Sequence, residues 1–421
     1  MNVLSLDNNN DQSQTAFMGL APFLRLSIAG IDFRPACQEM LEEAQKQPEN
    51  ANLWMNLSIA LFSLGLNDEG LAIQQQALSM QRIYHLPAEQ QPARIRLLVL
   101  ASPGNLSTNT PIDCLLENSD IDITYYFCSK PTPLADPVPE HDVLMVALGE
   151  SNTTRETLLA LREALRDWPR PIINTPQHIP AVERNTAGRI LQGIPGLLIP
   201  PTLRAQRADL TAIAQGNTPL STVFEGLDFP VILRPIGSHG GRDLEKIENG
   251  SELTTYLNQV RDDEFYLSRF IDYRSADGNF RKIRIALVEG VPYVCHMAIS
   301  SHWMIHYVNA GMYEDAGKRA EEADFMQHFD AFVSRHRSAL DAIFERSKLD
   351  YVCLDCAETL DGELLIFEID HAMIVHAMDS QALFPHKQQH IHKLKQAFRE
   401  HCLSLMASAH GGKHARACHE G

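Results

Sequence analysis

The chain has 421 residues, more than one hydrophobic core usually serves, so two or three domains are expected. Its formal net charge of −17 argues against a nucleic-acid partner, because such binding depends on neutralising phosphates with lysine and arginine. The sequence shows neither a signal peptide nor an apolar stretch long enough to span a bilayer, and eight scattered cysteines suit a reducing compartment, so we expect a cytoplasmic protein without a membrane partner.

The N-terminal part of the chain divides into a polar start and a helical region. Residues 1–20 are rich in Asn, Gln and Ser, and we expect them to be mobile. Between 21 and 90 the apolar residues recur at helical spacing, which predicts an α-helical region. The stretch 84–94 contains two prolines and few apolar side chains, which indicates a linker to the next domain.

Part of the helical region resembles a tetratricopeptide repeat, a 34-residue helical unit. The residues at consensus positions are Trp54, Leu57, Gly65, Ala77 and Leu78. Gly70 departs from the pattern, since alanine is usual there. Only about one and a half repeats are legible, whereas about three are needed for a stable array. A plain helical hairpin packed on the next domain is therefore at least as well supported as a site for a peptide or protein partner.

Short apolar runs alternate with helical stretches between 94 and 204. The runs predicted to be strands are 94–102, 121–128, 141–149 and 171–176. Thr153 and Glu156 form a capping-box pattern before an amphipathic helix. This alternation of strand and helix predicts a small α/β domain with a parallel sheet.

A third domain is predicted from 205 to 408. The runs predicted to be its strands are 229–236, 264–271, 282–290, 291–299, 349–358 and 363–370. Hairpin-type turns at Glu289-Gly290 and Asp361-Gly362 join two pairs of them, so the sheets are expected to be largely antiparallel. Residues 409–421 lack apolar periodicity and are expected to be disordered. The predicted fold class is therefore α+β and multidomain.

A glycine-rich turn follows the first of these strands. The strand ends at Arg234, and the turn contains Gly237, Ser238, His239, Gly240 and Gly241. Glycines let backbone N–H groups approach a ligand closely, and the neighbouring cation favours an anion such as a phosphate. The turn has neither the spacing of a Walker A loop nor a G-x-G-x-x-G pattern. By itself it is better explained as a glycine hairpin beside a surface arginine.

Carboxylates lie on the last two predicted strands. Asp355 is on the first strand, and Glu368 and Asp370 share one face of the second, across a tight Asp-Gly turn. Side chains on one face of neighbouring strands can share a hard cation, and Mg²⁺ prefers carboxylates together with phosphate oxygens. The flanking residues are apolar, so unpaired carboxylates would be costly there. This favours a metal site over a solvated polar face.

The order of these elements resembles the ATP-grasp superfamily over roughly residues 94–405. The segment 171–202 resembles the entry segment that closes the small domain. FPVILRPIGSHGG resembles the strand and flap that hold the triphosphate, and EFYLSRFID resembles the hinge strand that meets adenine. RKIRIALVEGVPY resembles the substrate-side hairpin, and LDYVCLDCAETLDGELLIFEID resembles the magnesium strands. The chain looks closest to the carboxylate–amine ligases, which include the ribosomal-protein glutamate ligase and D-alanine–D-alanine ligase.

The resemblance implies that ATP and Mg²⁺ are the cofactors, with Mn²⁺ as a substitute for Mg²⁺. The residues that it assigns to ATP are Arg184, Arg234, Gly237, Ser238, His239, Gly240, Gly241, Tyr266, Ser268, Arg269, Phe270 and Ile271. The residues that it assigns to the metal are Asp355, Glu368 and Asp370. Arg234 and Arg284 are the cations that it assigns to catalysis.

Three features depart from the family pattern. Arg184 and Arg234 stand where the family has two phosphate-binding lysines, which keeps the charge and allows bidentate contacts. Asp370 replaces the usual asparagine and adds negative charge, and Arg269 stands where an acidic residue is common. These departures motivate a weakened or repurposed nucleotide site as an alternative.

A histidine-rich segment lies where the family has its substrate pocket. The residues predicted to contact substrate are His302, His306, Asn309 and His371. The i, i+4 spacing of His302 and His306 also suits a metal, but no H-E-x-x-H pattern accompanies it. Cys353 and Cys356 point to opposite faces of a strand, so we interpret them as buried structural cysteines.

The favoured prediction is an ATP- and Mg²⁺-dependent ligase that joins a carboxylate to an amine through an acyl phosphate. Its substrates are predicted to be small molecules or peptides. The alternative is a nucleotide-binding scaffold that recruits a peptide through its helical region.

Overall fold

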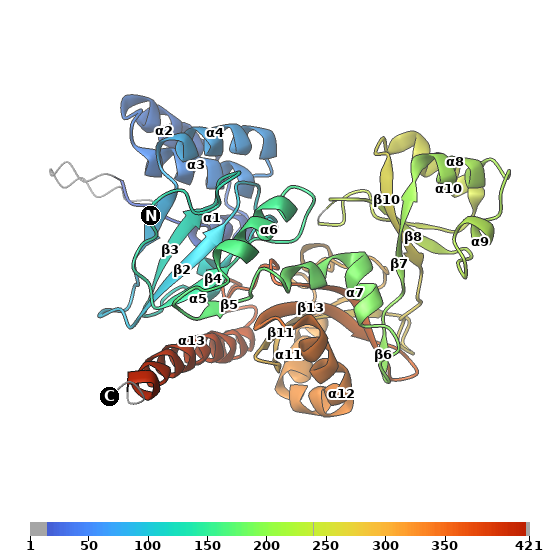
Figure 1. Cartoon of the computed structure of the whole chain (residues 1–421). Coiled ribbons are helices and arrows are strands. Elements are labelled where there is room, and N and C mark those ends of the chain that lie inside the picture. Colours follow the sequence, from blue (N-terminus) through green and yellow to red (C-terminus); the bar gives the residue numbers. More distant parts are fainter. Residues whose placement is uncertain (1–14, 239, 418–421) are drawn as a thin grey trace.

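The computed structural model describes residues 15–238 and 240–417, with side chains described through residue 409. The chain folds into N-terminal helices, a five-stranded α/β sheet, a four-stranded sheet and a second five-stranded sheet (Figure 1). The predicted mixed α+β class is confirmed. Within the described residues, no helix combines the length and the apolar character that a membrane span requires.

Four helices form the N-terminal region. They are α1 (Ala21–Ile28), α2 (Arg34–Lys46), α3 (Ala51–Ser63) and α4 (Asn67–Met80). Asn50 caps α3 by accepting a hydrogen bond from the N–H of Leu53, and Gly65 has a positive φ soon after the helix ends. Ten of the 13 residues of α3 are buried, so this helix is the core of the region rather than an exposed binding surface.

The chain's own N-terminal segment covers one side of α3. Asn56 accepts a hydrogen bond from the N–H of Met18 (2.9 Å) and donates one to the carbonyl of Ala16 (2.9 Å), and Phe17 between them is buried. Residues 15–20 are held by these contacts, whereas the other residues of the predicted mobile start lie outside the described part. This packing agrees with a plain helical hairpin, and a peptide or protein partner for the region stays a prediction.

The first sheet has the strand order β1-β3-β2-β4-β5. Its strands are β1 (Ile83–Leu86), β2 (Ile95–Ala101), β3 (Ile121–Phe127), β4 (Val143–Val146) and β5 (Ile172–Ile173). β2, β3, β4 and β5 are parallel, as predicted. β1 pairs antiparallel with β3. The linker predicted over 84–94 is therefore wrong for its first residues, 84–86, which belong to β1. Tyr84 explains the difference, because its ring is fully buried and packs edge-on against Phe127.

Three helices accompany this sheet and the segment that follows it. They are α5 (Ile112–Leu116), α6 (Arg155–Ala164) and α7 (Arg184–Ile190), with a 3₁₀ turn, η1 (Ile179–Val182), before α7. The capping box predicted at Thr153 is wrong, because Thr154 occupies the cap position of α6. The hydroxyl of Thr154 donates to the carbonyl of Gly149 (2.6 Å), and no side chain caps the helix.

The four-stranded sheet has the order β7-β10-β8-β9, and every pairing in it is antiparallel. Its strands are β7 (Thr202–Gln206), β8 (Val231–Pro235), β9 (Glu245–Ile247) and β10 (Glu264–Arg269). The helices that pack with it are α8 (Arg207–Ala214), α9 (Leu220–Val223) and α10 (Gly250–Gln259). This unit has its own hydrophobic core and stands out as a separate lobe (Figure 1).

The second five-stranded sheet has the order β12-β11-β13-β14-β6. Its strands are β6 (Leu197–Leu198), β11 (Phe280–Val288), β12 (Val291–Ser300), β13 (Tyr351–Glu358) and β14 (Leu364–Asp370). Only the pairing of β6 is parallel, so the largely antiparallel sheets are confirmed. The turn between β11 and β12 has a positive φ at both Glu289 and Gly290, as its hairpin pattern predicts.

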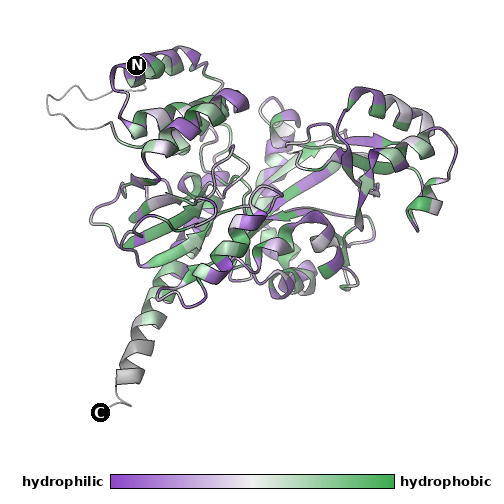
Figure 2. Cartoon of the chain, turned by 45° about the horizontal axis from the view of Figure 1, so that its top comes forward, coloured by the Kyte–Doolittle hydropathy of each residue, from purple (hydrophilic) through white to green (hydrophobic). Residues whose placement is uncertain are grey.

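Helices cover this sheet on both faces. α11 (Ala316–Gln327) and α12 (Phe329–Ser347) share a core with Ile285 and Leu354, and α13 (Lys387–Ala417) shares another with Cys353. Hydrophobic residues colour much of the α/β sheet, whereas hydrophilic and hydrophobic residues are mixed along the helices (Figure 2). α13 continues to Ala417, so the expectation of disorder from residue 409 is wrong up to that point, and residues 418–421 lie outside the described part.

Candidate functional site

A cavity of about 300 Å³ lies between the four-stranded sheet and the second five-stranded sheet. The charged residues that line it are Arg184, Arg234, Arg269, Lys282, Arg284, Asp355 and Glu368. Five cations face two carboxylates, an excess of three positive charges in a chain whose net charge is −17. Such a local field attracts an anion into the cavity, although the protein as a whole repels anions.

Strand register places the charges of the five-stranded sheet in one row. Asp355 on β13 lies directly opposite Arg284 on β11 and opposite Glu368 on β14. Asp355 and Glu368 therefore lie on one face of the sheet, as predicted. Both residues line the cavity, together with Arg234 from the other sheet.

Asp355 is buried and fully engaged by two cations. Its Oδ1 accepts from Nε of Arg284 (2.8 Å), and its Oδ2 accepts from Nη2 of Arg284 (3.0 Å) and lies 2.7 Å from Nζ of Lys282. Burial alone would favour the protonated acid, but these two cations outweigh it and hold the pKa of Asp355 well below its usual range. The three side chains form a fixed ion triplet at the floor of the cavity.

Glu368 is paired with a cation from a distant segment. Its Oε1 accepts a hydrogen bond from Nη2 of Arg184, the first residue of α7, and Nη1 of Arg184 donates to the carbonyl of Phe367 (3.4 Å). Burial favours the protonated form of Glu368, but Arg184 and Arg234 outweigh it and lower the pKa. Both carboxylates of the predicted acidic pair are therefore ionised and occupied by protein cations.

Arg234 differs from these paired cations. It ends β8 and is buried, and its partners are both atoms of Ser238: Nε donates to the hydroxyl (3.1 Å) and Nη2 to the carbonyl. Among the described residues, no carboxylate lies within ion-pair distance of it. Burial and the nearby Arg184 lower the pKa of Arg234 to about 10. An unpaired buried guanidinium beside a cavity is disposed to bind an anion.

The glycine-rich turn closes over one side of the cavity. Gly240 and Gly241 line it with positive φ, and Gly237 and Ser238 precede them, while His239 lies outside the described residues. A side chain on Gly241 would collide with the imidazole of His306, so the turn rests against this histidine. The buried Nε2 of His306 has no hydrogen-bond partner among the described residues.

The predicted hinge strand forms another wall of the cavity. The residues of this strand that line it are Tyr266, Ser268, Arg269, Phe270 and Ile271. Phe270 packs edge-on against Trp303, with ring centroids 5.7 Å apart, and the ammonium of Lys246 lies 4.1 Å from its ring centre. This aromatic and apolar wall suits a flat organic group, as the hinge prediction requires.

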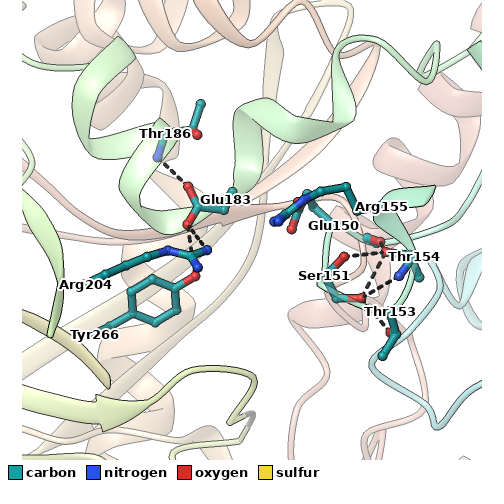
Figure 3. A network of polar contacts seen from close by, with 10 residues as sticks. Glu150, Ser151, Thr153, Thr154, Arg155, Glu183, Thr186, Arg204 and Tyr266 are labelled. Carbon is teal, nitrogen blue, oxygen red and sulfur yellow. Dashed lines mark hydrogen bonds and ion pairs between the residues drawn. The ribbon is translucent and has the colours of Figure 1, made fainter. Parts of the chain in front are cut away.

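A polar network that the sequence analysis did not single out lies at the end of this wall (Figure 3). Glu183 accepts hydrogen bonds from the N–H of Thr186 (2.7 Å), the hydroxyl of Tyr266 (2.9 Å) and the guanidinium of Arg204 (3.3 Å). It thereby caps α7 and orients the residue that follows it, Arg184. The signal in the sequence was a carboxylate three residues before Thr186, which is a helix-cap spacing.

Lys282 is a second residue that the sequence analysis missed. It lines the cavity, pairs with Asp355 and donates to the carbonyl of Ile305 (3.3 Å). It lies two residues before Arg284 on β11, so both side chains point to the same face of the sheet. That period-two spacing of cations was the signal available in the sequence.

The structure does not bring all predicted site residues together. Asp370, His302, Asn309 and His371 do not line the cavity. His371 is fully buried, and its Nε2 lies 3.0 Å from the carbonyl of Leu148, which links β14 to the α/β sheet. His302 is exposed, and Asn309 accepts from the N–H of His306 (2.9 Å). Of the four predicted substrate contacts, only His306 lines the cavity.

The predicted magnesium trio does not form a metal centre in this arrangement. Within the described residues, no three or more His, Cys, Asp or Glu side chains are grouped so that they can hold a metal ion. Asp355 and Glu368 are occupied by Lys282, Arg284 and Arg184, and Oδ1 of Asp370 accepts from the N–H of Ala372 (3.0 Å). The residues present therefore do not fit Mg²⁺ as a resident ion.

Comparison with known proteins gives structural likeness only. No protein-family model and no curated protein matches the chain. The solved structures that resemble it include the D-alanine–D-alanine ligase from Bacillus anthracis complexed with ATP, with 15% identity, a TM-score of 0.45, and coverage of 75% of this chain and 99% of that chain. The D-alanine–D-alanine ligase from Coxiella burnetii has 12% identity, a TM-score of 0.46, and coverage of 78% and 99%.

A RimK domain protein ATP-grasp from Sphaerobacter thermophilus is also similar, with 12% identity, a TM-score of 0.40, and coverage of 72% and 98%. At these values the likeness carries no assignment of fold family or function. The assignment depends on the geometry of the site.

Proposed function

We propose that this chain is an ATP-dependent ligase of the ATP-grasp type, which joins a carboxylate to an amine through an acyl phosphate. The observation that carries the proposal is the cavity between two antiparallel sheets, where five cations face two carboxylates under a glycine-rich turn. A triphosphate supplies the negative charge that this cavity lacks. The adjoining wall around Phe270 suits the base of a nucleotide.

The proposed roles follow from the positions of the residues. Arg234 and the backbone of the glycine-rich turn hold phosphate oxygens, because Arg234 has no carboxylate partner in the part of the chain that the structure describes. Arg284 donates three of its five N–H groups, to Asp355 and to the carbonyl of Ile374 (3.1 Å), so two remain for a ligand. These two suit the charge that develops on an acyl phosphate.

The chemistry needs no nucleophile from the enzyme. A carboxylate oxygen of the substrate attacks the terminal phosphorus of ATP, and the bond to ADP breaks. The amine nitrogen then attacks the acyl carbon, a proton leaves the nitrogen, and inorganic phosphate departs. The glycine-rich turn would exclude water during this step and so protect the acyl phosphate from hydrolysis.

The test is a two-stage assay on the full-length protein. ATP binding is measured first by equilibrium dialysis. Pools of amino acids, small carboxylic acids and short peptides are then added with ATP and hydroxylamine, which replaces the amine and converts an acyl phosphate into a stable hydroxamate. We expect ADP release and hydroxamate formation with at least one pool, and loss of both in Arg284→Met while ATP binding persists.

One alternative is a nucleotide-binding scaffold, which the full pairing of both acidic residues favours. ATP binding without ADP release or hydroxamate from any pool would support the scaffold and contradict the ligase. Failure to bind ATP at all would contradict both proposals.

A further inference from the structure

We propose that Lys282 takes the place of a divalent cation, so that the nucleoside triphosphate is bound by protein cations with no metal ion at Asp355 and Glu368. The inference rests on the proposed nucleotide site and goes beyond it, because it names which group neutralises the phosphates. Its starting point is the ion triplet of Asp355, Lys282 and Arg284 at the floor of the cavity.

Asp355 has little capacity left for a metal ion. A carboxylate offers about four lone-pair positions, and three charged N–H groups from Lys282 and Arg284 already point at them within 3.0 Å. The residue is 2% exposed, so no water competes freely for the remaining position. A metal ion would have to displace a cation that is itself partly buried and would then lack a carboxylate, which is strongly unfavourable.

Lys282 is held where its remaining donor meets the cavity. Its ammonium has three N–H groups; one lies against Asp355 (2.7 Å), and another donates to the carbonyl of Ile305 (3.3 Å). The Lys282 side chain is 19% exposed, and the residue lines the cavity. A fixed ammonium with one free donor is a point charge of the kind that binds phosphate oxygens.

The charge balance of the cavity supports the same conclusion. The five lining cations exceed the two carboxylates by three positive charges before any ion is added. A nucleoside triphosphate carries roughly four negative charges at neutral pH, so the protein by itself nearly neutralises it. A divalent ion at the acidic pair would raise the excess to five positive charges. The site would then carry more positive charge than the triphosphate can neutralise. The charge of Glu368 is likewise already balanced, because Arg184 pairs with it.

The proposal is tested by ATP binding with and without divalent ions. Equilibrium dialysis with labelled ATP is done on the full-length protein in excess EDTA and in excess MgCl₂. For the unaltered protein we expect the two Kd values to agree within about threefold. For Lys282→Met we expect binding in EDTA to weaken by about tenfold or more. We expect Mg²⁺ to restore most of the loss, because two lone-pair positions of Asp355 are then open beside those that Arg284 occupies.

Two further variants serve as controls for the loss of charge at Lys282. Lys282→Arg retains the charge and should bind ATP in EDTA nearly as well as the unaltered protein. Lys395→Met is the matched control, because Lys395 donates to the carbonyl of Glu117 away from the cavity, and it should change neither Kd. Circular dichroism checks that each variant is folded.

A second readout follows the metal directly. Mn²⁺ electron paramagnetic resonance on the protein alone should show no bound ion in the unaltered chain and a bound ion in Lys282→Met. Binding of ATP by the unaltered protein only when Mg²⁺ is present, or Mn²⁺ held by the unaltered chain and lost in Asp355→Asn, would overturn the inference. No ATP binding under either condition would instead contradict the proposed function, so the two failures are distinguishable.

Discussion

The two sheets that face the cavity are both antiparallel, yet they contribute different chemistry. The second five-stranded sheet carries Asp355, Lys282 and Arg284, whose charges balance one another in part, and Glu368, which pairs with Arg184 of α7. The four-stranded sheet contributes apolar walls, a glycine-rich turn and two cations, Arg234 and Arg269, that have no carboxylate partner among the described residues. Removing one partner of a buried ion pair destabilises the fold, whereas a charge left without a partner is available to a ligand. We therefore expect substitution of Asp355 to affect stability most, and substitution of Arg234 to affect ligand binding with little change in stability.

The largest expected effect is on the stability of the charged sheet. Asp355→Asn leaves Lys282 and Arg284 buried without a carboxylate, which we expect to lower the free energy of unfolding by about 3–5 kcal/mol. This loss of unfolding free energy is measured by urea unfolding at pH 7, with circular dichroism as the signal. The control is Asp361→Asn in the exposed turn between β13 and β14, which should change stability little. A loss of less than about 1 kcal/mol for Asp355→Asn would show that the triplet is not a structural unit.

In the four-stranded sheet, we expect Arg234→Met to weaken ATP binding without lowering the free energy of unfolding. Removing an unpaired buried cation costs the fold little, because no carboxylate is left behind. We expect the Kd for ATP to rise by about 10- to 100-fold while the free energy of unfolding is unchanged or higher. Arg189→Met, on an exposed position of α7, is the control for both measurements. A large stability loss in Arg234→Met would contradict the division between the sheets.

The glycine-rich turn offers a smaller and more local test. Gly240 and Gly241 both have positive φ, so alanine at either position strains the backbone by about 1 kcal/mol. Only at Gly241 does the new methyl group also meet His306, whereas no atom of the described residues lies within 4 Å of it at Gly240. We expect Gly241→Ala to weaken ATP binding several-fold more than Gly240→Ala.

Adding His306→Ala should remove that difference, as a double-mutant cycle would measure by equilibrium dialysis. Equal effects of the two alanine substitutions, with no coupling to His306, would show that the turn does not rest on this histidine when nucleotide binds.

The smallest expected effect is at the end of β13, three residues from Asp355. A hydrogen bond from His336 and an ion pair with Arg335 lower the pKa of Glu358 from 4.5 to about 2. Because the folded pKa is the lower one, this contribution to stability is complete above pH 4.5 and is lost as the pH falls toward 2. Glu358→Gln should therefore cost about 1 kcal/mol at pH 7 and almost nothing near pH 2.

Urea unfolding across this range measures the difference between Glu358→Gln and the unaltered chain. Glu345→Gln, on an exposed position of α12, is the control. A difference that does not shrink as the pH falls would mean that the ion pair is not its cause.

Much of the fold was predictable because it is local. Alternating apolar residues and the Glu289-Gly290 turn predicted the antiparallel hairpins, and buried runs separated by helices predicted the parallel sheet. The errors occurred where tertiary packing overrides a local signal. Tyr84 is drawn into the edge of the α/β sheet from a proline-rich stretch, and α13 extends through a segment without apolar periodicity.

The sequence by itself determined which residues share a strand face. Lys282 and Arg284 share a face by period-two alternation, whereas Asp355 lies opposite Glu368 because the register of β13 and β14 shifts between Asp355 and Cys356. Only the tertiary structure decided which cation meets which carboxylate. Arg284 reaches Asp355 from 71 residues away and Arg184 reaches Glu368 from 184 residues away, through strand order and the docking of α7. Such pairings depend on the register of distant segments, which no local pattern encodes.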